Sequence, residues 1–232
     1  MPWLVTLTLL SGPARDGDDA AFARAREEMV ATQIASRGVH DAKTLAAMRK
    51  VPRHLFVPSS AVGQAYDDYP LPIGHGQTIS QPYIVAFMTE ALQLAGSERV
   101  LEVGTGSGYQ SALLSLLARR VFSIEIVPEL AAGAAAVLRG VLGLDNIDLR
   151  VGDGRLGWPE EAPFDRILVT AAPTSVPAPL LEQLSPDGRM VIPVGPDPGV
   201  QRLRLLERTG NGAERTVDLL PVRFVPMTGG QD

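Results

Sequence analysis

A buried strand that turns through three glycines into a helix constrains the fold of this chain most strongly. Residues 100–108 read VLEVGTGSG, an apolar run followed by glycines at every second position. Glycines allow a tight turn and leave no Cβ between the backbone and a ligand, and the helix that follows begins with free N–H groups. The segment therefore predicts a ligand-binding turn at the carboxyl end of a strand, as several nucleotide-binding folds use.

Strand-like and helix-like segments alternate around this turn. Strands are expected at Val100–Val103, Val121–Ile126, Leu149–Val151, Arg166–Thr170 and Met190–Val194, and helices at Gln110–Ala118, Pro128–Arg139 and Pro179–Leu184. Such alternation predicts an α/β fold whose sheet is parallel, with right-handed crossovers. Two further strand-like runs, Gln201–Glu207 and Thr216–Val225, flank a Gly-Asn-Gly turn and predict an antiparallel hairpin at the sheet edge.

The chain before the sheet is expected to be helical. Apolar spacing predicts a helix from Ala20 to Ser36, and Asp41 is a candidate cap for a second one. Residues 1–28 are predicted to be a poorly ordered extension, and 29–232 a single domain. That domain divides into N-terminal helices and a Pro- and Gly-containing functional loop at 29–79, a β/α core at 80–195 and C-terminal strands at 196–232.

The spacing of the glycines and of three carboxylates limits which class of ligand the turn can bind. A dinucleotide fingerprint needs GxGxxG, but Tyr109 stands where its last small residue would be, and no GxxxxGK[ST] motif is present. Glu102 and Glu125 end consecutive predicted strands, and Asp153 follows a third. The Glu125 carboxylate can accept hydrogen bonds from both ribose hydroxyls, and the Asp153 carboxylate can accept one from an adenine amino group. This order fits the nucleoside part of S-adenosylmethionine.

Composition excludes several kinds of chemistry and partner. The 232 residues include no cysteine and only three histidines, which lie far apart, so thiolate catalysis is excluded and no metal site is expected. The net charge is −5 and no apolar run approaches 18 residues, so neither nucleic acid nor a membrane is an expected partner. Basic clusters such as Arg49, Lys50 and Arg53 are interpreted as solvated helix faces. A chain without cysteine also suits a reducing, cytoplasmic location.

Several segments together resemble the protein-L-isoaspartate O-methyltransferases. The glycine turn, Glu125 and the segment GDGR at 152–155 are shared by class I methyltransferases generally, whereas QTISQP at 77–82 is specific to this family. Further matching segments are QIASRG at 33–38, VPRHLFVP at 51–58, PDGRMVIPVG at 186–195 and RFVP at 223–226. The resemblance covers about Met29 to Thr228, which is nearly the whole chain.

The resemblance implies a fold, an activity and a substrate. The fold would be the Rossmann-like class I methyltransferase fold, a doubly wound, mostly parallel sheet with N-terminal helices and a C-terminal β-hairpin. The activity would be transfer of a methyl group from S-adenosylmethionine to the α-carboxylate of L-isoaspartyl residues in damaged proteins, leaving S-adenosylhomocysteine. Isoaspartyl peptides and proteins are thus the expected partners, and the enzyme is expected to be a monomer.

The same resemblance identifies the expected site residues. Ser80 is predicted to be catalytic, because an ionised carboxylate needs no general base and a neutral hydroxyl can orient it. The alternative interpretation of Ser80 is that it only caps the helix that follows, and His75 is expected to face solvent rather than act as a base. Expected cofactor-binding residues are Gln77, Thr78, Ile79, Glu102, Gly104, Gly106, Ser107, Gly108, Glu125, Asp153 and Gly154. Expected substrate-binding residues are Thr78, Ile79, Ser80, Val194, Gly195 and Val225.

Other functions stay open on sequence grounds. A class I methyltransferase acting on a small molecule or on RNA would share the glycine turn, Glu125 and Asp153, but would not need the loop from Thr78 to Ser80. A non-catalytic adaptor that retains the cofactor fold is a second alternative, and the complete loops argue against it. An NAD-dependent oxidoreductase is disfavoured by the GxGxG spacing.

Overall fold

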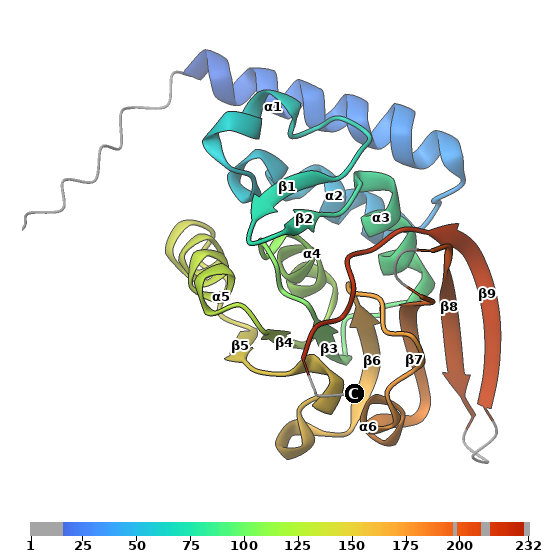
Figure 1. Ribbon diagram of the computed structural model, residues 1–232. Coiled ribbons are helices and arrows are strands. Elements are labelled where there is room, and N and C mark those ends of the chain that lie inside the picture. Colours follow the sequence, from blue (N-terminus) through green and yellow to red (C-terminus); the bar gives the residue numbers. More distant parts are fainter. Residues whose placement is uncertain (1–15, 197–198, 210–213, 230–232) are drawn as a thin grey trace, which may run out of the picture.

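A seven-stranded sheet forms the centre of the protein in a computed structural model, which describes residues 16–196, 199–209 and 214–229 (Figure 1). The strands lie in the order β5-β4-β3-β6-β7-β8-β9. The five parallel strands are β3 (Arg99–Val103), β4 (Arg120–Glu125), β5 (Ile147–Val151), β6 (Phe164–Val169) and β7 (Leu184–Val194). Each overlaps a strand expected from the sequence, so the predicted parallel core is confirmed.

Alternation along β3 divides the core into two layers. Val100 packs into the cluster under the N-terminal helices, whereas Leu101 and Val103 pack into the cluster on the opposite face. The first face is covered by α3 (Pro82–Ala91), α4 (Tyr109–Leu117), α5 (Pro128–Ala135) and η5 (Ala136–Val141). The second is covered by α6 (Ala178–Glu182) and by Trp158 and Ala162, which flank η7 (Pro159–Glu161) after the short η6 (Gly154–Leu156). Helices on both faces confirm the doubly wound architecture.

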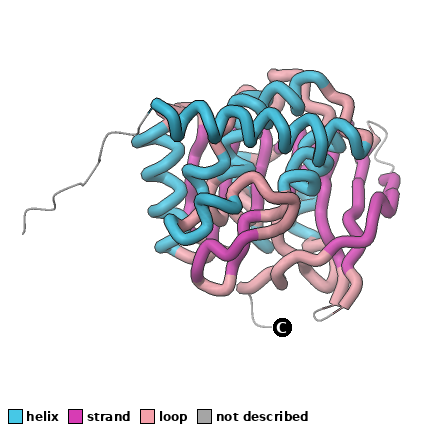
Figure 2. The backbone as a smooth tube through the Cα atoms, turned by 90° about the horizontal axis from the view of Figure 1, so that it is seen from above, coloured by secondary structure: helices cyan, strands magenta, loops and turns pink. Residues whose placement is uncertain are grey.

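The N-terminal segment forms a further helical layer, which crosses above the sheet (Figures 1 and 2). Asp41 accepts a hydrogen bond from the backbone of Thr44 at 2.7 Å, which confirms the predicted cap. A short hairpin then leads into α3. The elements are α1 (Asp16–Glu28), η1 (Met29–Ile34), η2 (Ala35–Arg37), α2 (Ala42–Lys50), η3 (Arg53–Phe56), η4 (Ser59–Gln64), β1 (Leu71–Gly74) and β2 (Gln77–Ile79).

The prediction of a poorly ordered extension over residues 1–28 needs correction for its second half. Residues 16–28 form α1, and the ring of Phe22 stacks on His54 with ring centres 4.0 Å apart. Phe22 and Ala25 pack against the core cluster, so one side of the helix has an apolar partner. Residues 1–15 lie outside the described residues.

The C-terminal hairpin is confirmed and ends in a segment that returns over the sheet. β8 (Gln201–Arg208) pairs antiparallel with β7 and with β9 (Glu214–Val222), while the predicted turn at 210–212 lies outside the described residues. After β9 the chain crosses back over the carboxyl ends of the parallel strands (Figure 1). Ala172 holds it there, accepting from Met227 N and donating to Val225 O, both at 2.9 Å.

Among the described residues, no helix combines the length and the apolar composition needed to cross a membrane.

Replacing Phe22 with alanine tests whether α1 is part of the fold. Loss of a half-buried ring that stacks on His54 should lower the free energy of unfolding by about 1–2 kcal/mol, measured by urea denaturation. Arg24→Ala, at an exposed position of the same helix, is the control and should change it by less than about 0.5 kcal/mol. Equal stability of the two variants would contradict the structural role of α1.

Candidate functional site

A cavity lies where the strand order of the sheet reverses. The chain passes from β3 to β4 and β5 on one side, then crosses to β6 on the other side of β3. Open α/β sheets bind ligands at the carboxyl ends of their strands at such a switch point. It is lined by residues at the ends of β3, β4 and β6, by the segment from Gln77 to Ser80 and by the C-terminal segment from Val225 to Thr228. Apolar side chains with a few polar groups among them are typical of the lining of small-molecule sites.

Two glycines make the floor of this cavity possible. Gly104 has a φ of +95°, and a Cβ there would lie 2.2 Å from Thr170 Oγ1. That hydroxyl donates to the carbonyls of Val103 (3.0 Å) and Gly104 (2.7 Å), which holds the turn against β6. A Cβ on Gly154 would lie 2.3 Å from Val103 Cγ1. The sequence therefore needs glycine at both positions, because any side chain would collide with Thr170 or Val103 and push the cavity wall apart.

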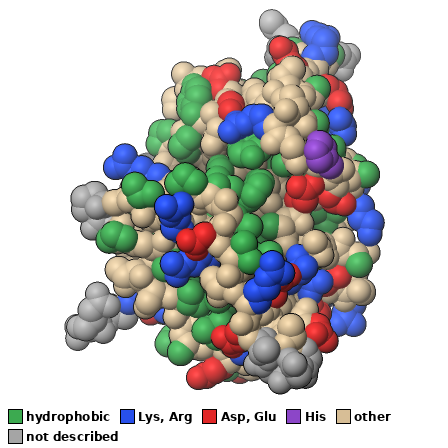
Figure 3. All heavy atoms as spheres, turned by 90° about the vertical axis from the view of Figure 1, so that its right-hand side faces the viewer, with side chains coloured by type: hydrophobic (Ala, Val, Ile, Leu, Met, Phe, Trp, Pro, Cys, Tyr) green, Lys and Arg blue, Asp and Glu red, His purple; other side chains and the backbone are tan. Residues whose placement is uncertain are grey.

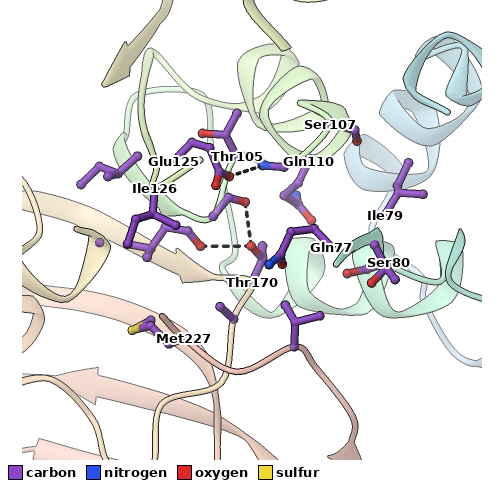
Figure 4. A pocket seen from close by; sticks show the side chains of 18 of the residues that line it. Gln77, Ile79, Ser80, Thr105, Ser107, Gln110, Glu125, Ile126, Thr170 and Met227 are labelled. Atoms are coloured by element: carbon purple, nitrogen blue, oxygen red, sulfur yellow. Dashed lines mark hydrogen bonds between the residues drawn. The ribbon is translucent and has the colours of Figure 1, made fainter. Parts of the chain in front are cut away.

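Glu125 supplies paired acceptors at one end of the cavity. Its carboxylate accepts from Gly106 N through Oε2 at 2.7 Å and from Val127 N through Oε1 at 3.0 Å. Each carboxylate oxygen keeps further acceptor capacity, which two neighbouring ligand hydroxyls can use. Ile126 lies beside it and is 37% exposed, so an apolar surface adjoins the acceptors (Figure 4). This end of the cavity suits a ribose and a flat ring.

Ser80 lies at the other end, across the cavity from Glu125 and Ile126 (Figure 4). The N-cap of α3 is Gln81, so the alternative interpretation of Ser80 as a helix cap is wrong. Within the described residues the Ser80 hydroxyl has no hydrogen-bond partner. Ser80 also lines a second, open cleft, which shares with the first cavity the residues Thr78, Ser80, Thr170, Val225 and Pro226. The Ser80 side chain therefore lies at the junction of the two cavities, with a hydroxyl that has no partner among the described residues.

Arg53 holds the loop that presents Ser80. Its side chain is fully buried and donates to Ala65 O at 2.8 Å and to Ser80 O at 2.9 Å. Its Cζ lies 4.9 Å from the centre of the Tyr109 ring, and Nη1 has no partner among the described residues. Burial lowers the pKa of Arg53 and raises that of Tyr109 to about 12. The interpretation of Arg53 as part of a solvated helix face is therefore wrong.

Glu102 is buried behind the cavity wall. Its Oε2 accepts from the hydroxyls of Ser111 and Ser123, the latter at 2.6 Å, and Ser123 Oγ lies 2.6 Å from Thr105 Oγ1, which belongs to a residue of the wall. Burial raises the pKa of Glu102 to about 7, although the two serine hydroxyls act in the opposite direction. Glu102 thus reaches the cavity only through other side chains, in contrast to the direct contact expected from the sequence.

The other predicted site residues divide between the cavity wall and positions behind it. Those that line the cavity are Gln77, Thr78, Ile79, Ser80, Gly104, Gly106, Ser107, Glu125, Gly154 and Val225. Gly108, Asp153, Val194 and Gly195 line neither cavity. Gly108 is the N-cap of α4, and Asp153 accepts from the backbone of Arg155 at 2.9 Å. Val194 is buried at the end of β7, and Gly195 N donates to Pro173 O.

Several wall residues were not predicted. Thr105, Tyr109, Gln110, Ile126 and Thr170 line the cavity as well. A sequence signal existed for Thr170, which ends a predicted strand in the same way as Glu125 does. The tail from about Val225 to Thr228 was expected, from the family resemblance, to bind the peptide. Its residue Met227 lines the cavity because the chain folds back after the C-terminal hairpin.

Comparisons with known proteins point to one family. The model of a family described as protein-L-isoaspartate(D-aspartate) O-methyltransferase matches residues 24–232. A protein-L-isoaspartate O-methyltransferase of Anaeromyxobacter dehalogenans (strain 2CP-C) is 62% identical over 86% of this chain and 95% of its own length. One of Opitutus terrae is 55% identical over 97% of this chain and 96% of its own length.

Solved structures show the same fold. A protein-L-isoaspartate O-methyltransferase superposes with a TM-score of 0.80 at 29% identity, over 88% of this chain and 66% of that one. A second structure, described as a putative enzyme of this name from Plasmodium falciparum in complex with S-adenosyl-L-homocysteine, has a TM-score of 0.75 at 24% identity. It covers 88% of this chain and 98% of that one.

Arg53→Met should loosen the loop that presents Ser80. The carbonyls of Ala65 and Ser80 would lose their donors, so we expect stability to fall by about 2 kcal/mol and amide hydrogen exchange over residues 77–81 to accelerate. Arg26→Met is a matched control, because Arg26 is half-buried in the same layer but bonds to Tyr66 and to Arg49 O. Exchange at the wild-type rate over 77–81 in Arg53→Met would refute this role.

Glu102→Gln should change how stability depends on pH. The folded chain keeps a proton on Glu102 up to about pH 7, whereas the unfolded chain releases it near pH 4.5. The stabilisation from this group is therefore complete below pH 4.5 and is lost as the pH rises through 7. Glutamine stays neutral at every pH. The free energy of unfolding of the variant should therefore rise relative to that of wild type as the pH increases from 4.5 to 8, by up to about 3 kcal/mol.

Urea denaturation at several pH values measures this difference, with the exposed Glu182→Gln as control. Parallel curves for wild type and Glu102→Gln would contradict the raised pKa.

Proposed function

The chain belongs to the protein-L-isoaspartate(D-aspartate) O-methyltransferase family, and we propose that its Ser80 directs the reaction of that family at the junction of the two cavities. The enzyme transfers a methyl group from S-adenosylmethionine to the α-carboxylate of L-isoaspartyl residues in damaged proteins. The observation that supports the site assignment is that Ser80, whose hydroxyl has no hydrogen-bond partner among the described residues, lines both the more enclosed cavity and the more open cleft. Two such spaces suit a small cosubstrate and a peptide.

The residues of the enclosed cavity fit S-adenosylmethionine. Its ribose hydroxyls would bind the remaining acceptor positions of Glu125, and its adenine would lie against Ile126. The backbone of the glycine turn, from Gly104 to Ser107, would face the amino-acid part, since no Cβ intervenes at either glycine. Gln77 to Ile79 would complete the wall towards Ser80. When bound, S-adenosylmethionine supplies a methyl group on a positively charged sulfur.

The protein contributes alignment rather than proton transfer. A peptide carboxylate is ionised at neutral pH and can attack a methyl group without a general base. The hydroxyl of Ser80 can donate a hydrogen bond to one carboxylate oxygen and leave the other directed at the enclosed cavity. Holding the reacting atoms in line is worth several kcal/mol of the barrier. His75 fits this scheme, because it lies exposed in the β1–β2 turn and lines neither cavity.

A neutral hydroxyl also suits the charge change of the reaction. A carboxylate and a sulfonium lose their charges as the methyl group moves, so a fully charged partner would favour the ground state over the transition state. Among the described residues that line the enclosed cavity, Glu125 is the only charged one, and Figure 4 places it at the end away from Ser80. The reacting end is therefore lined by neutral groups such as Thr78, Ser80 and Thr170.

Two further properties stay predictions of the sequence. We propose that the enzyme acts as a monomer and in the cytoplasm, on the basis of the family resemblance and of a chain without cysteine.

Ser80→Ala should lower kcat/KM for an isoaspartyl peptide by about 10- to 100-fold, because the carboxylate would lose the hydrogen bond that orients it. Affinity for S-adenosylhomocysteine should change little, as Ser80 lies away from Glu125. Transfer of labelled methyl to matched isoaspartyl and aspartyl peptides measures the effect, and the exposed Ser97→Ala is the control. Full turnover by Ser80→Ala would exclude the role of Ser80, whereas a wild-type enzyme that methylates neither peptide would exclude the function itself.

A further inference from the structure

The open cleft beside Ser80 contains a single charged side chain among its described residues. The cleft is lined mainly by apolar and small residues from the loop before α3, from the two residues that precede β8, and from the end of β9 with the segment that follows it. Arg223 is the exception, at the point where the chain leaves β9. Ser80 and Arg223 line the same cleft, so one bound peptide can contact both.

Arg223 differs from three arginines of the hairpin, while Arg202, which is also exposed and unpaired among the described residues, does not line the cleft. Arg204, Arg208 and Arg215, on the adjacent hairpin, each pair with a carboxylate at 3.0, 3.2 and 3.4 Å respectively. Arg223 is exposed and has neither an ion pair nor a hydrogen bond with any residue of the described ranges. Its guanidinium is therefore available to an anion that enters the cleft.

The backbone beside Arg223 is held in place. Gln201, which is 1% exposed, accepts from Phe224 N at 2.6 Å and donates to Phe224 O at 3.0 Å. Both backbone groups of the neighbouring residue are thus bound by one buried side chain. The backbone from which the Arg223 side chain projects is therefore fixed, so its guanidinium can reach only peptide positions near the residue bound at Ser80.

We propose that Arg223 is a specificity determinant that favours isoaspartyl substrates with an aspartate or glutamate close to the damaged residue. The inference rests on the proposed function, since it places the substrate α-carboxylate at Ser80 and a second carboxylate at Arg223. An extended chain advances about 3.3 Å per residue, so the second carboxylate belongs within a few residues of the isoaspartyl position.

The proposed preference for acidic peptides depends on the charge inside the cleft and not on the net charge of the protein. The protein has a net charge of −5, which disfavours acidic ligands at long range. The face on the side of the C-terminal hairpin has acidic and basic side chains interspersed with apolar ones, without a field of one sign (Figure 3). A single unpaired cation in an apolar cleft is therefore the local attraction for an acidic peptide. An exposed ion pair of this kind is worth about a two- to fivefold change in KM.

The test compares isoaspartyl peptides that carry Glu, Gln or Lys at each position from three before to three after the isoaspartyl residue. Wild type should show a KM about two- to fivefold lower for Glu than for Lys at one or two positions, and the difference should shrink at high salt. Arg223→Gln should abolish this preference, and Arg223→Glu should reverse it. Arg215→Gln changes the net charge equally but lies at the other end of β9, so it should retain the wild-type preference.

Two results would overturn the proposal. One is a wild-type KM that does not depend on the charge of the flanking residue at any position, and the other is a preference for Glu that persists in Arg223→Glu. Methylation of the peptides with neutral flanks separates these results from a failure of the proposed function. If no isoaspartyl peptide is methylated, the function is wrong, whereas uniform methylation of all peptides rejects only the role of Arg223.

Discussion

One buried guanidinium, that of Arg53, fixes the N-terminal layer, the loop that presents Ser80 and the start of α4 relative to one another. Arg53 donates to carbonyls in the η4 region and in the loop that presents Ser80, and lies against Tyr109 at the start of α4. A buried cation without a carboxylate partner is costly unless carbonyl oxygens and an aromatic ring surround it. The N-terminal layer, the loop and the helix after the glycine turn therefore depend on one another for the position of Ser80.

The site follows from the topology of the sheet together with this connection. Reversal of the strand order opens a space at the ends of β3, β4 and β6, and glycine at 104 and 154 allows the wall of that space to pack closely against Thr170 and Val103. Glu125 marks the end suited to a nucleoside, and Ser80 the end at which the two cavities meet. A chain without cysteine and with three histidines is compatible with this chemistry, since an ionised carboxylate needs no base to accept a methyl group.

Sequence reasoning succeeded where the signal was local. The alternation of apolar runs predicted all five parallel strands, and Asp41 caps its helix as expected. Prediction from the sequence failed where the result depended on the direction in which a side chain points. Glu102, at the end of β3, points towards α4 and meets Ser111, although a carboxylate beside a glycine turn was expected to contact the ligand. Ser80 could be interpreted as the helix cap because the start of a helix cannot be predicted to within one residue, and the N-cap of α3 is the next residue, Gln81.

The sequence by itself determined the order of the elements, the position of the glycine turn and the chemical class of the ligand. Each depends on residues that are close together in the chain. Only the tertiary structure decided which residues meet at the site. Arg53, Ser80, Thr170 and Met227 are far apart in the chain, and they converge because the N-terminal layer and the C-terminal segment both fold over the same edge of the sheet. Burial at such a junction is a property of packing between distant elements, which no local pattern encodes.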